Sequence, residues 1–180
     1  LRDRMKFFKK APETEKIVKS LKDNNNIYLV PAFTGLGAPY WDANARGVLS
    51  GITRDTSPKE IVRATIEAVA YQTYDLFEAM KHDGLRPKIV KVDGGMVMNN
   101  WFSQFLSDIV NVKVLRPKVQ ETTALGAAFM AGLQIGVYKS LKDISKNWHL
   151  DKNFSPKMKN QNRNHLLKGW AKAIKKTLSN

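Results

Sequence analysis

The sequence has no cysteine among its 180 residues. This absence excludes a disulfide scaffold and a thiolate zinc site, and it agrees with a reducing compartment, so we expect a cytoplasmic protein. No apolar run approaches the ~20 residues that a membrane-spanning helix needs, so we expect no membrane span. The three histidines (His82, His149 and His165) stand alone without metal-ligand spacing, and we predict no metal site.

Acidic residues are also scarce. Lys and Arg total 30 against 16 Asp and Glu, which gives a formal net charge of +14. That charge permits an anionic partner, so a basic nucleic-acid-binding module is one hypothesis. The lysines are densest over residues 139–176, on segments patterned as solvated helix faces. We therefore favour a compositional bias and expect no nucleic-acid partner.

The chain is long enough for one domain with its own core, and no linker divides it. It opens on Leu1-Arg2-Asp3-Arg4-Met5, which resembles the middle of a helix, so we expect a piece of a longer protein. We divide it into a helical lead-in (1–26), a nucleotide-binding domain (27–150) and a helical tail (151–180). The composition and the Pro and Gly positions predict helices over 1–10 and 13–22, a strand over 27–30, a loop over 33–47 and a short strand over 48–52.

A helix start at Ser57-Pro58-Lys59-Glu60 combines an N-cap, a proline in the first turn and a capping-box glutamate. The helix should run to about Lys81. Beyond it the pattern alternates between strand and helix, which predicts α/β layering. The expected strands are 88–92 and 112–115. The expected helices are 100–110, 140–146 and 157–178, together with one that begins at Thr122 or Thr123 as its N-cap.

The turn after the strand at 88–92 reads Asp93-Gly94-Gly95, and Asn99 or Asn100 can cap the helix that follows. It is neither a P-loop nor a dinucleotide fingerprint, because the required lysine and third glycine are absent. Two interpretations stay open. The glycines form only a tight turn, in which Asp93 accepts backbone N–H groups. Alternatively, the Gly95 backbone lies against an adenine or ribose while the Asn99 amide bonds the base.

Catalytic pairings are few. Asp93 and Asp108 are the candidate carboxylates, and no Ser/His/Asp arrangement is persuasive. The helix from Thr123 to Ala128 is rich in small residues, as is typical of close packing against a neighbour or against a nucleotide-binding layer. The loop Phe33–Asp42 is long and aromatic, so we predict either a functional loop or a plug for the core.

These segments together resemble the C-terminal part of the FGGY carbohydrate kinases. The likeness runs through nearly the whole chain. Its motifs are Val30–Asp42, Arg63-Ala64-Thr65, Ala70–Thr73, Val92–Gly95 with Asn99-Asn100, Thr123–Ala128 and Gly169-Trp170. The Phe33–Trp41 loop is similar to that of the family members that phosphorylate glycerol.

The resemblance implies an α/β, ribonuclease-H-like (actin-like ATPase) fold, here the incomplete C-terminal domain of a two-domain kinase. It implies transfer of the γ-phosphoryl of MgATP to glycerol, with ATP and Mg²⁺ as cofactors and a homo-oligomer as the complete form. Gly95 and Asn99 match the family's nucleotide-binding Gly and Asn. The family's catalytic Asp lies N-terminal to the residues present, so we assign no catalytic residue and no metal ligand here. Another FGGY sugar kinase and a purely structural assembly domain are the alternatives.

Overall fold

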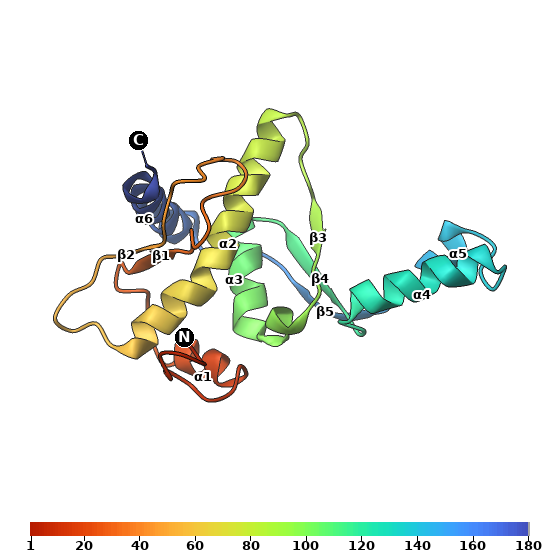
Figure 1. The fold of residues 1–180 in the computed structure, drawn as a ribbon, viewed down its shortest axis with the longest axis horizontal. Helices are drawn as coiled ribbons and strands as arrows, with labels where there is room; N and C mark the ends of the chain where they lie inside the picture. The colour runs from red at the N-terminus through yellow and green to blue at the C-terminus, as the bar shows by residue number, and fades with distance from the viewer. Residues whose placement is uncertain (180) are drawn as a thin grey trace.

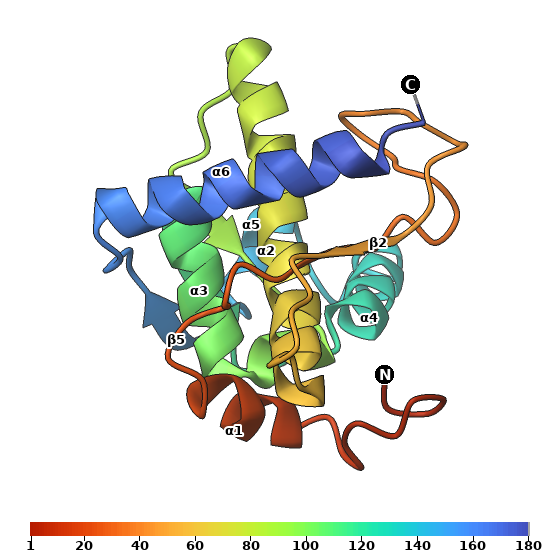
Figure 2. The ribbon, with the colours of Figure 1, turned by 90° about the vertical axis from the view of Figure 1, so that its left-hand side faces the viewer.

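The computed structural model describes residues 1–179 of the chain. Helices α2 and α3 lie between a two-stranded sheet covered by α6 on one side and a three-stranded sheet on the other (Figures 1 and 2). The elements, in chain order, are α1 (Glu13–Lys19), β1 (Tyr28–Val30), β2 (Val48–Ser50), α2 (Pro58–His82), β3 (Ile89–Lys91), the 3₁₀ turn η1 (Gly95–Met98), α3 (Asn100–Val110), β4 (Lys113–Pro117), α4 (Thr122–Gln134), α5 (Leu141–Ser145), β5 (Leu150–Phe154) and α6 (Asn160–Thr177).

The strand pairing confirms the predicted α/β layering. Strands β3 and β4 are parallel, with Val90 opposite Val114, and α3 is the crossover between them. The order in this sheet is β3-β4-β5, and β5 runs antiparallel to β4. Strands β1 and β2 form a separate antiparallel pair. The glycine turn therefore leaves the carboxyl end of a parallel strand, where α/β folds place their ligands.

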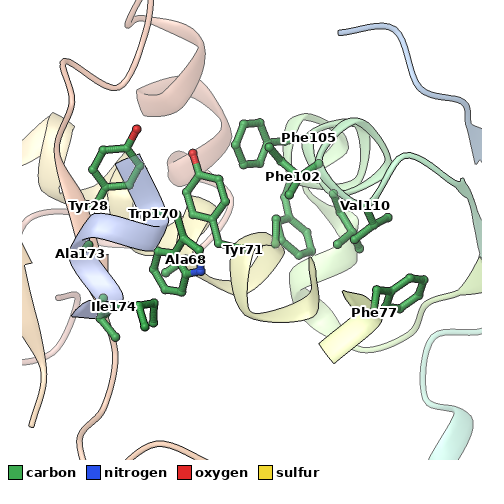
Figure 3. Packing of buried hydrophobic residues seen from close by; sticks show 14 of the residues in the cluster. Tyr28, Ala68, Tyr71, Phe77, Phe102, Phe105, Val110, Trp170, Ala173 and Ile174 are labelled. Carbon is green, nitrogen blue, oxygen red and sulfur yellow. The ribbon is translucent and has the colours of Figure 1, made fainter. Parts of the chain in front are cut away.

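Helix α2 begins as the sequence predicts. Ser57 caps it by accepting from the Lys59 amide, and the Glu60 side chain accepts from the Ser57 backbone at 2.9 Å, which completes the capping box. Its inward face supplies Tyr71 to an aromatic cluster that joins the layers (Figure 3). The Tyr71 ring stacks on Trp170 of α6 with centroids 5.2 Å apart and meets Phe105 of α3 edge-on at 5.6 Å.

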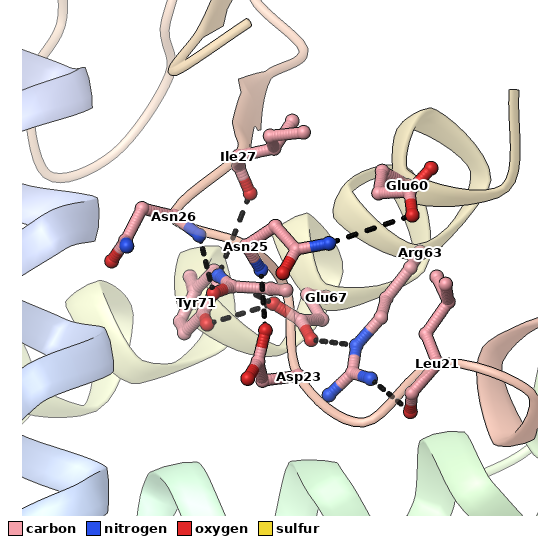
Figure 4. Close-up of polar contacts among 10 residues, drawn as sticks. Leu21, Asp23, Asn25, Asn26, Ile27, Glu60, Arg63, Glu67 and Tyr71 are labelled. Carbon is pink, nitrogen blue, oxygen red and sulfur yellow. Dashed lines mark hydrogen bonds and ion pairs between the residues drawn. The ribbon is translucent and has the colours of Figure 1, made fainter. Parts of the chain in front are cut away.

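A buried polar network fixes the segment between α1 and β1 against α2 (Figure 4). Arg63 donates to Glu67 at 2.8 Å and to the Leu21 carbonyl at 2.8 Å, while Tyr71 and Asn24 donate to the other Glu67 oxygen. Burial raises the pKa of Glu67 despite the neighbouring guanidinium. Since each partner is hydrogen-bonded, the network holds α1 in a defined position over α3.

Two expected features are wrong. Residues 1–10 form turns and bends, and no helix begins before Glu13. Neither Thr122 nor Thr123 caps α4; the capping position is Glu121, and no side chain bonds the free amides there. In both places the local composition favours a helix, but the backbone does not adopt the geometry of an N-cap at the expected residue. Contacts with neighbouring residues override helix propensity there.

Helices α4 and α5 extend away from the rest of the molecule (Figure 1). Within α4 most residues are exposed, and Gly126 has no atom within 4 Å of where a Cβ would stand. The close packing predicted for the small residues of Thr123–Ala128 is therefore not found in the described part of the chain.

Candidate functional site

A cavity of about 370 Å³ lies where the segment before and within α1 meets the 3₁₀ turn η1. Its walls are largely apolar, from Phe8, Ile66, Met96 and Met98, and its polar groups are Thr14, Glu15 and Asn99. An apolar slot with a few placed hydrogen-bonding groups suits a flat heterocyclic ligand whose edges are polar. The turn that the sequence singled out is thus one wall of a cavity.

The two glycines of the turn serve different purposes. Gly94 has φ of 82° and ψ of 173°, a conformation that side chains with a Cβ rarely adopt. Gly95 has no such constraint, and no atom lies within 4 Å of its missing Cβ. Gly94 therefore permits the turn, while Gly95 leaves open space on a residue that lines the cavity, so that a ligand can approach the backbone.

Of the two candidate caps, Asn99 and Asn100, the structure selects Asn99 as the N-cap of α3, and hydrogen bonds at both its oxygen and its nitrogen define the orientation of its amide. Its Oδ1 accepts from the Phe102 amide at 3.0 Å, and its Nδ2 donates to Thr14 Oγ1 at 3.4 Å. The Thr14 hydroxyl can only accept this bond, because its own proton goes to the Ala11 carbonyl at 2.7 Å. One Nδ2 hydrogen and one Oδ1 lone pair remain for a ligand.

Glu15 of α1 binds Asn100, the first residue of α3. Its carboxylate accepts from the Asn100 amide at 3.3 Å and pairs with Lys19. Burial raises the pKa of Glu15, but the bonds from Lys19 and Asn100 outweigh burial and hold the pKa below its ordinary value. The carboxylate is therefore ionised at neutral pH beside the N-terminus of α3, a favourable place for a negative charge.

Arg116 supports η1 from the sheet side. Its guanidinium is almost buried, donates to the Val97 carbonyl at 2.8 Å and pairs with Asp151 at 2.7 Å. The sequence interpretation assigned no role to Thr14, Glu15 or Arg116. The sequence signal that could have pointed to Arg116 is its position as a charged residue at the end of a predicted strand. No local sequence feature marked Thr14 as a site residue.

The other candidate residues do not join this site. Asp93 is exposed and makes no hydrogen bond to the turn within residues 1–179; the Gly94 amide donates to the Gln120 carbonyl instead. Asp108 accepts from the amides of Lys157 and Met158, which attaches the segment before α6 to α3. Neither the Phe33–Asp42 loop nor the Thr123–Ala128 helix lines the cavity.

The aromatic loop is anchored elsewhere. Asp42 accepts from the Ser179 amide at 2.7 Å, and Trp41 is 78% exposed rather than part of the core. Among the described residues, no group of three or more His, Asp or Glu side chains comes together as a metal site would need. None of the described helices is both long and apolar enough to span a bilayer.

Comparison with known families agrees with this geometry. The C-terminal domain of the FGGY family of carbohydrate kinases matches residues 3–135. Glycerol kinase 1 of Pseudomonas aeruginosa is 53% identical over 179 residues, which are 99% of this chain and 36% of that protein. A glycerol kinase of Clostridium botulinum is 50% identical over the same shares. The chain thus spans about a third of the length of the curated relatives it matches.

Solved structures give the same result. Plasmodium falciparum glycerol kinase, crystallised with ADP, superposes with a TM-score of 0.84 at 35% identity, over 97% of this chain and 35% of that one. A ligand-bound xylulose kinase from Lactobacillus acidophilus has a TM-score of 0.77 at 25% identity, over 96% of this chain and 35% of that one. The fold is therefore the actin-like α/β fold that the sequence predicted.

Proposed function

Because the chain belongs to the FGGY family of carbohydrate kinases, we propose that it forms the adenine side of the ATP site of a glycerol kinase. In the complete enzyme, MgATP would transfer its γ-phosphoryl group to glycerol and give sn-glycerol 3-phosphate. The base would lie in the cavity between α1 and η1, against the Gly95 backbone, and the free edge of the Asn99 amide would bond it.

The observation that carries this proposal is the open space at Gly95 beside an amide with a defined orientation. No protein atom lies within 4 Å of the missing Cβ, so the residue is not needed for packing. The Asn99 amide retains one donor and one acceptor, the pair that an adenine edge requires. The cavity of about 370 Å³ is within the range of small-molecule sites.

Glycerol is the substrate that the comparisons favour. The relatives at 53% and 50% identity are named glycerol kinases, and the likeness to a solved glycerol kinase exceeds the likeness to xylulose kinase. Another FGGY sugar kinase is the second candidate, since xylulose and gluconate kinases share the fold. Phosphorylation of glycerol but not of pentuloses or gluconate by the complete enzyme would distinguish them.

This chain alone supplies binding rather than phosphoryl transfer. Such transfer depends on positioning the phosphates, the metal ion and the acceptor hydroxyl together. The described residues present no carboxylate cluster for Mg²⁺, so we assign the metal no ligand from this chain. We expect the 180-residue chain to show no turnover with MgATP and glycerol; measurable turnover would contradict this expectation.

Calorimetric titration of this chain with ADP tests the site. Gly95→Val should weaken ADP binding at least tenfold by filling the cavity wall, yet leave the unfolding free energy within about 0.5 kcal/mol, since the side chain meets no protein atom. Gly126→Val is the matched control, because it makes the same change at another open glycine, on α4 far from the cavity. It should leave ADP binding unchanged.

A second pair of variants separates binding from folding. Gly94→Ala forces a Cβ into a glycine-only conformation and should cost about 1–3 kcal/mol of stability. Asn99→Ala should raise the ATP KM of the complete enzyme more than the glycerol KM. A rise confined to the glycerol KM, or ADP binding unaffected by Gly95→Val, would overturn the assignment.

A further inference from the structure

A second hollow, of about 600 Å³, lies where α6 crosses β2. We call this hollow the basic groove, because its lining includes His165, Lys168, Lys172, Lys175 and Lys176 from α6. Asn26, Ser50 and Gly51 form the opposite side. In Figure 2 α6 crosses the upper part of α2 and α3, whereas α1 lies by their lower ends; the groove and the proposed nucleotide cavity share no lining residue and are separate.

The lysines of the basic groove share one face of the helix by sequence spacing. At 3.6 residues per turn, the four lysine positions 168, 172, 175 and 176, together with His165, fall within roughly 100° of one another. The opposite face of α6, with Trp170, Ala173 and Ile174, is buried in the core. Packing of that face therefore directs the lysines toward the groove and the exposed surface beside it.

Among residues 1–179, no carboxylate lines the basic groove. None of its four lysines pairs with an acidic side chain among residues 1–179; Lys176 donates to the Ser50 hydroxyl at 3.1 Å. Like charges gathered in a concave site raise the local potential and attract anions. From Lys168 to Lys176 the helix rises about 12 Å, which exceeds the size of a single phosphate.

Tyr28 closes the floor of the groove. Its hydroxyl is fully buried against Gly169, where any Cβ would overlap it, and it lies beside Asn24 and Glu67 of the buried polar network. The groups of the groove that a ligand can reach are therefore the lysines, Asn26 and Ser50.

We propose that the basic groove binds a small ligand carrying two or more phosphate groups, held by lysines at both ends and by Asn26 and Ser50 between them. Lysine ammonium groups bind phosphate as point charges, and the length of the groove favours two such groups over one. The volume suits a metabolite rather than an extended polymer.

The test is calorimetric titration of this chain with tripolyphosphate and with inorganic phosphate in 150 mM salt, where weak surface attraction is screened. We expect tripolyphosphate to bind at least tenfold more tightly than phosphate. Lys168→Gln/Lys172→Gln should weaken tripolyphosphate binding at least fivefold, because it removes two of the four ammonium groups that line the groove.

Lys139→Gln/Lys142→Gln is the matched control, because it removes two charges near and within α5, outside the groove. It should change tripolyphosphate affinity less than twofold. Equal losses in both double variants would mean that net charge alone attracts the anion and would overturn the proposal. Tight binding of duplex DNA that depends on the groove lysines, with no binding of tripolyphosphate, would also overturn it.

Discussion

The Asn99 side chain donates to the Thr14 hydroxyl across 3.4 Å, although the two residues lie 85 positions apart in the chain. This bond joins α1 to the first turn of α3 and orients the amide that the proposed nucleotide site uses. The Thr14 hydroxyl is itself oriented by the Ala11 carbonyl. The cavity therefore depends on how α1 docks, and not only on the glycine turn.

Replacing the Thr14 hydroxyl tests that dependence. Thr14→Val keeps the volume but leaves the Ala11 carbonyl and the Asn99 amide without this partner, so we expect a loss of about 1–2 kcal/mol in unfolding free energy. ADP affinity should fall about fivefold, which corresponds to roughly 1 kcal/mol. Thr14→Ser should restore both. Unchanged ADP affinity in Thr14→Val, measured by calorimetry, would show that ADP binding does not depend on the orientation of the Asn99 amide by α1.

The buried pair Arg63–Glu67 predicts a larger effect on stability. Glu67→Ala leaves the Arg63 guanidinium buried without its carboxylate, so we expect a loss of about 3–5 kcal/mol in urea unfolding. Glu67→Gln keeps an acceptor for Tyr71 and should cost clearly less. Similar losses in the two variants would indicate that the carboxylate charge, which both substitutions remove, sets the cost, and would contradict a contribution from the retained acceptor.

The capping box of α2 predicts a dependence on pH. Burial raises the pKa of Glu60, but bonds from the Ser57 side chain and backbone outweigh it and hold the pKa below its ordinary value. The unfolded chain, with a glutamate pKa of about 4.3, then takes up protons first as the solution is acidified. Stability from Glu60 is therefore present above about pH 4.3 and lost as pH falls through the folded pKa.

The measurement is the unfolding free energy between pH 7 and pH 3 for the natural chain and for Glu60→Gln. The variant should lose less stability on acidification than the natural chain. Because Glu67 is unchanged in both, its raised pKa contributes equally and cancels in the comparison. Identical pH curves would contradict the role of Glu60.

Local features were predictable where a few neighbouring residues decide the structure. The Ser57–Glu60 capping box, the Asn99 cap and the strands flanking α3 all form as expected. Interactions over three or four residues determine caps, and a β-branched run between turn residues determines a strand. The same reasoning failed for residues 1–10, which form turns and bends, because a short segment without a capped start is a marginal helix even where its composition favours one.

By itself, the sequence determined the family, the α/β layering and the position of the glycine turn, because each depends on short motifs and their order. The tertiary structure decided which residues face that turn. Thr14, Glu15 and Arg116 come from segments far apart in sequence, and only packing of α1 and β4 against α3 and η1 brings them together. It likewise decided that α6 turns its lysines toward β2, since burial of Trp170 selects the face of α6 that stays outside.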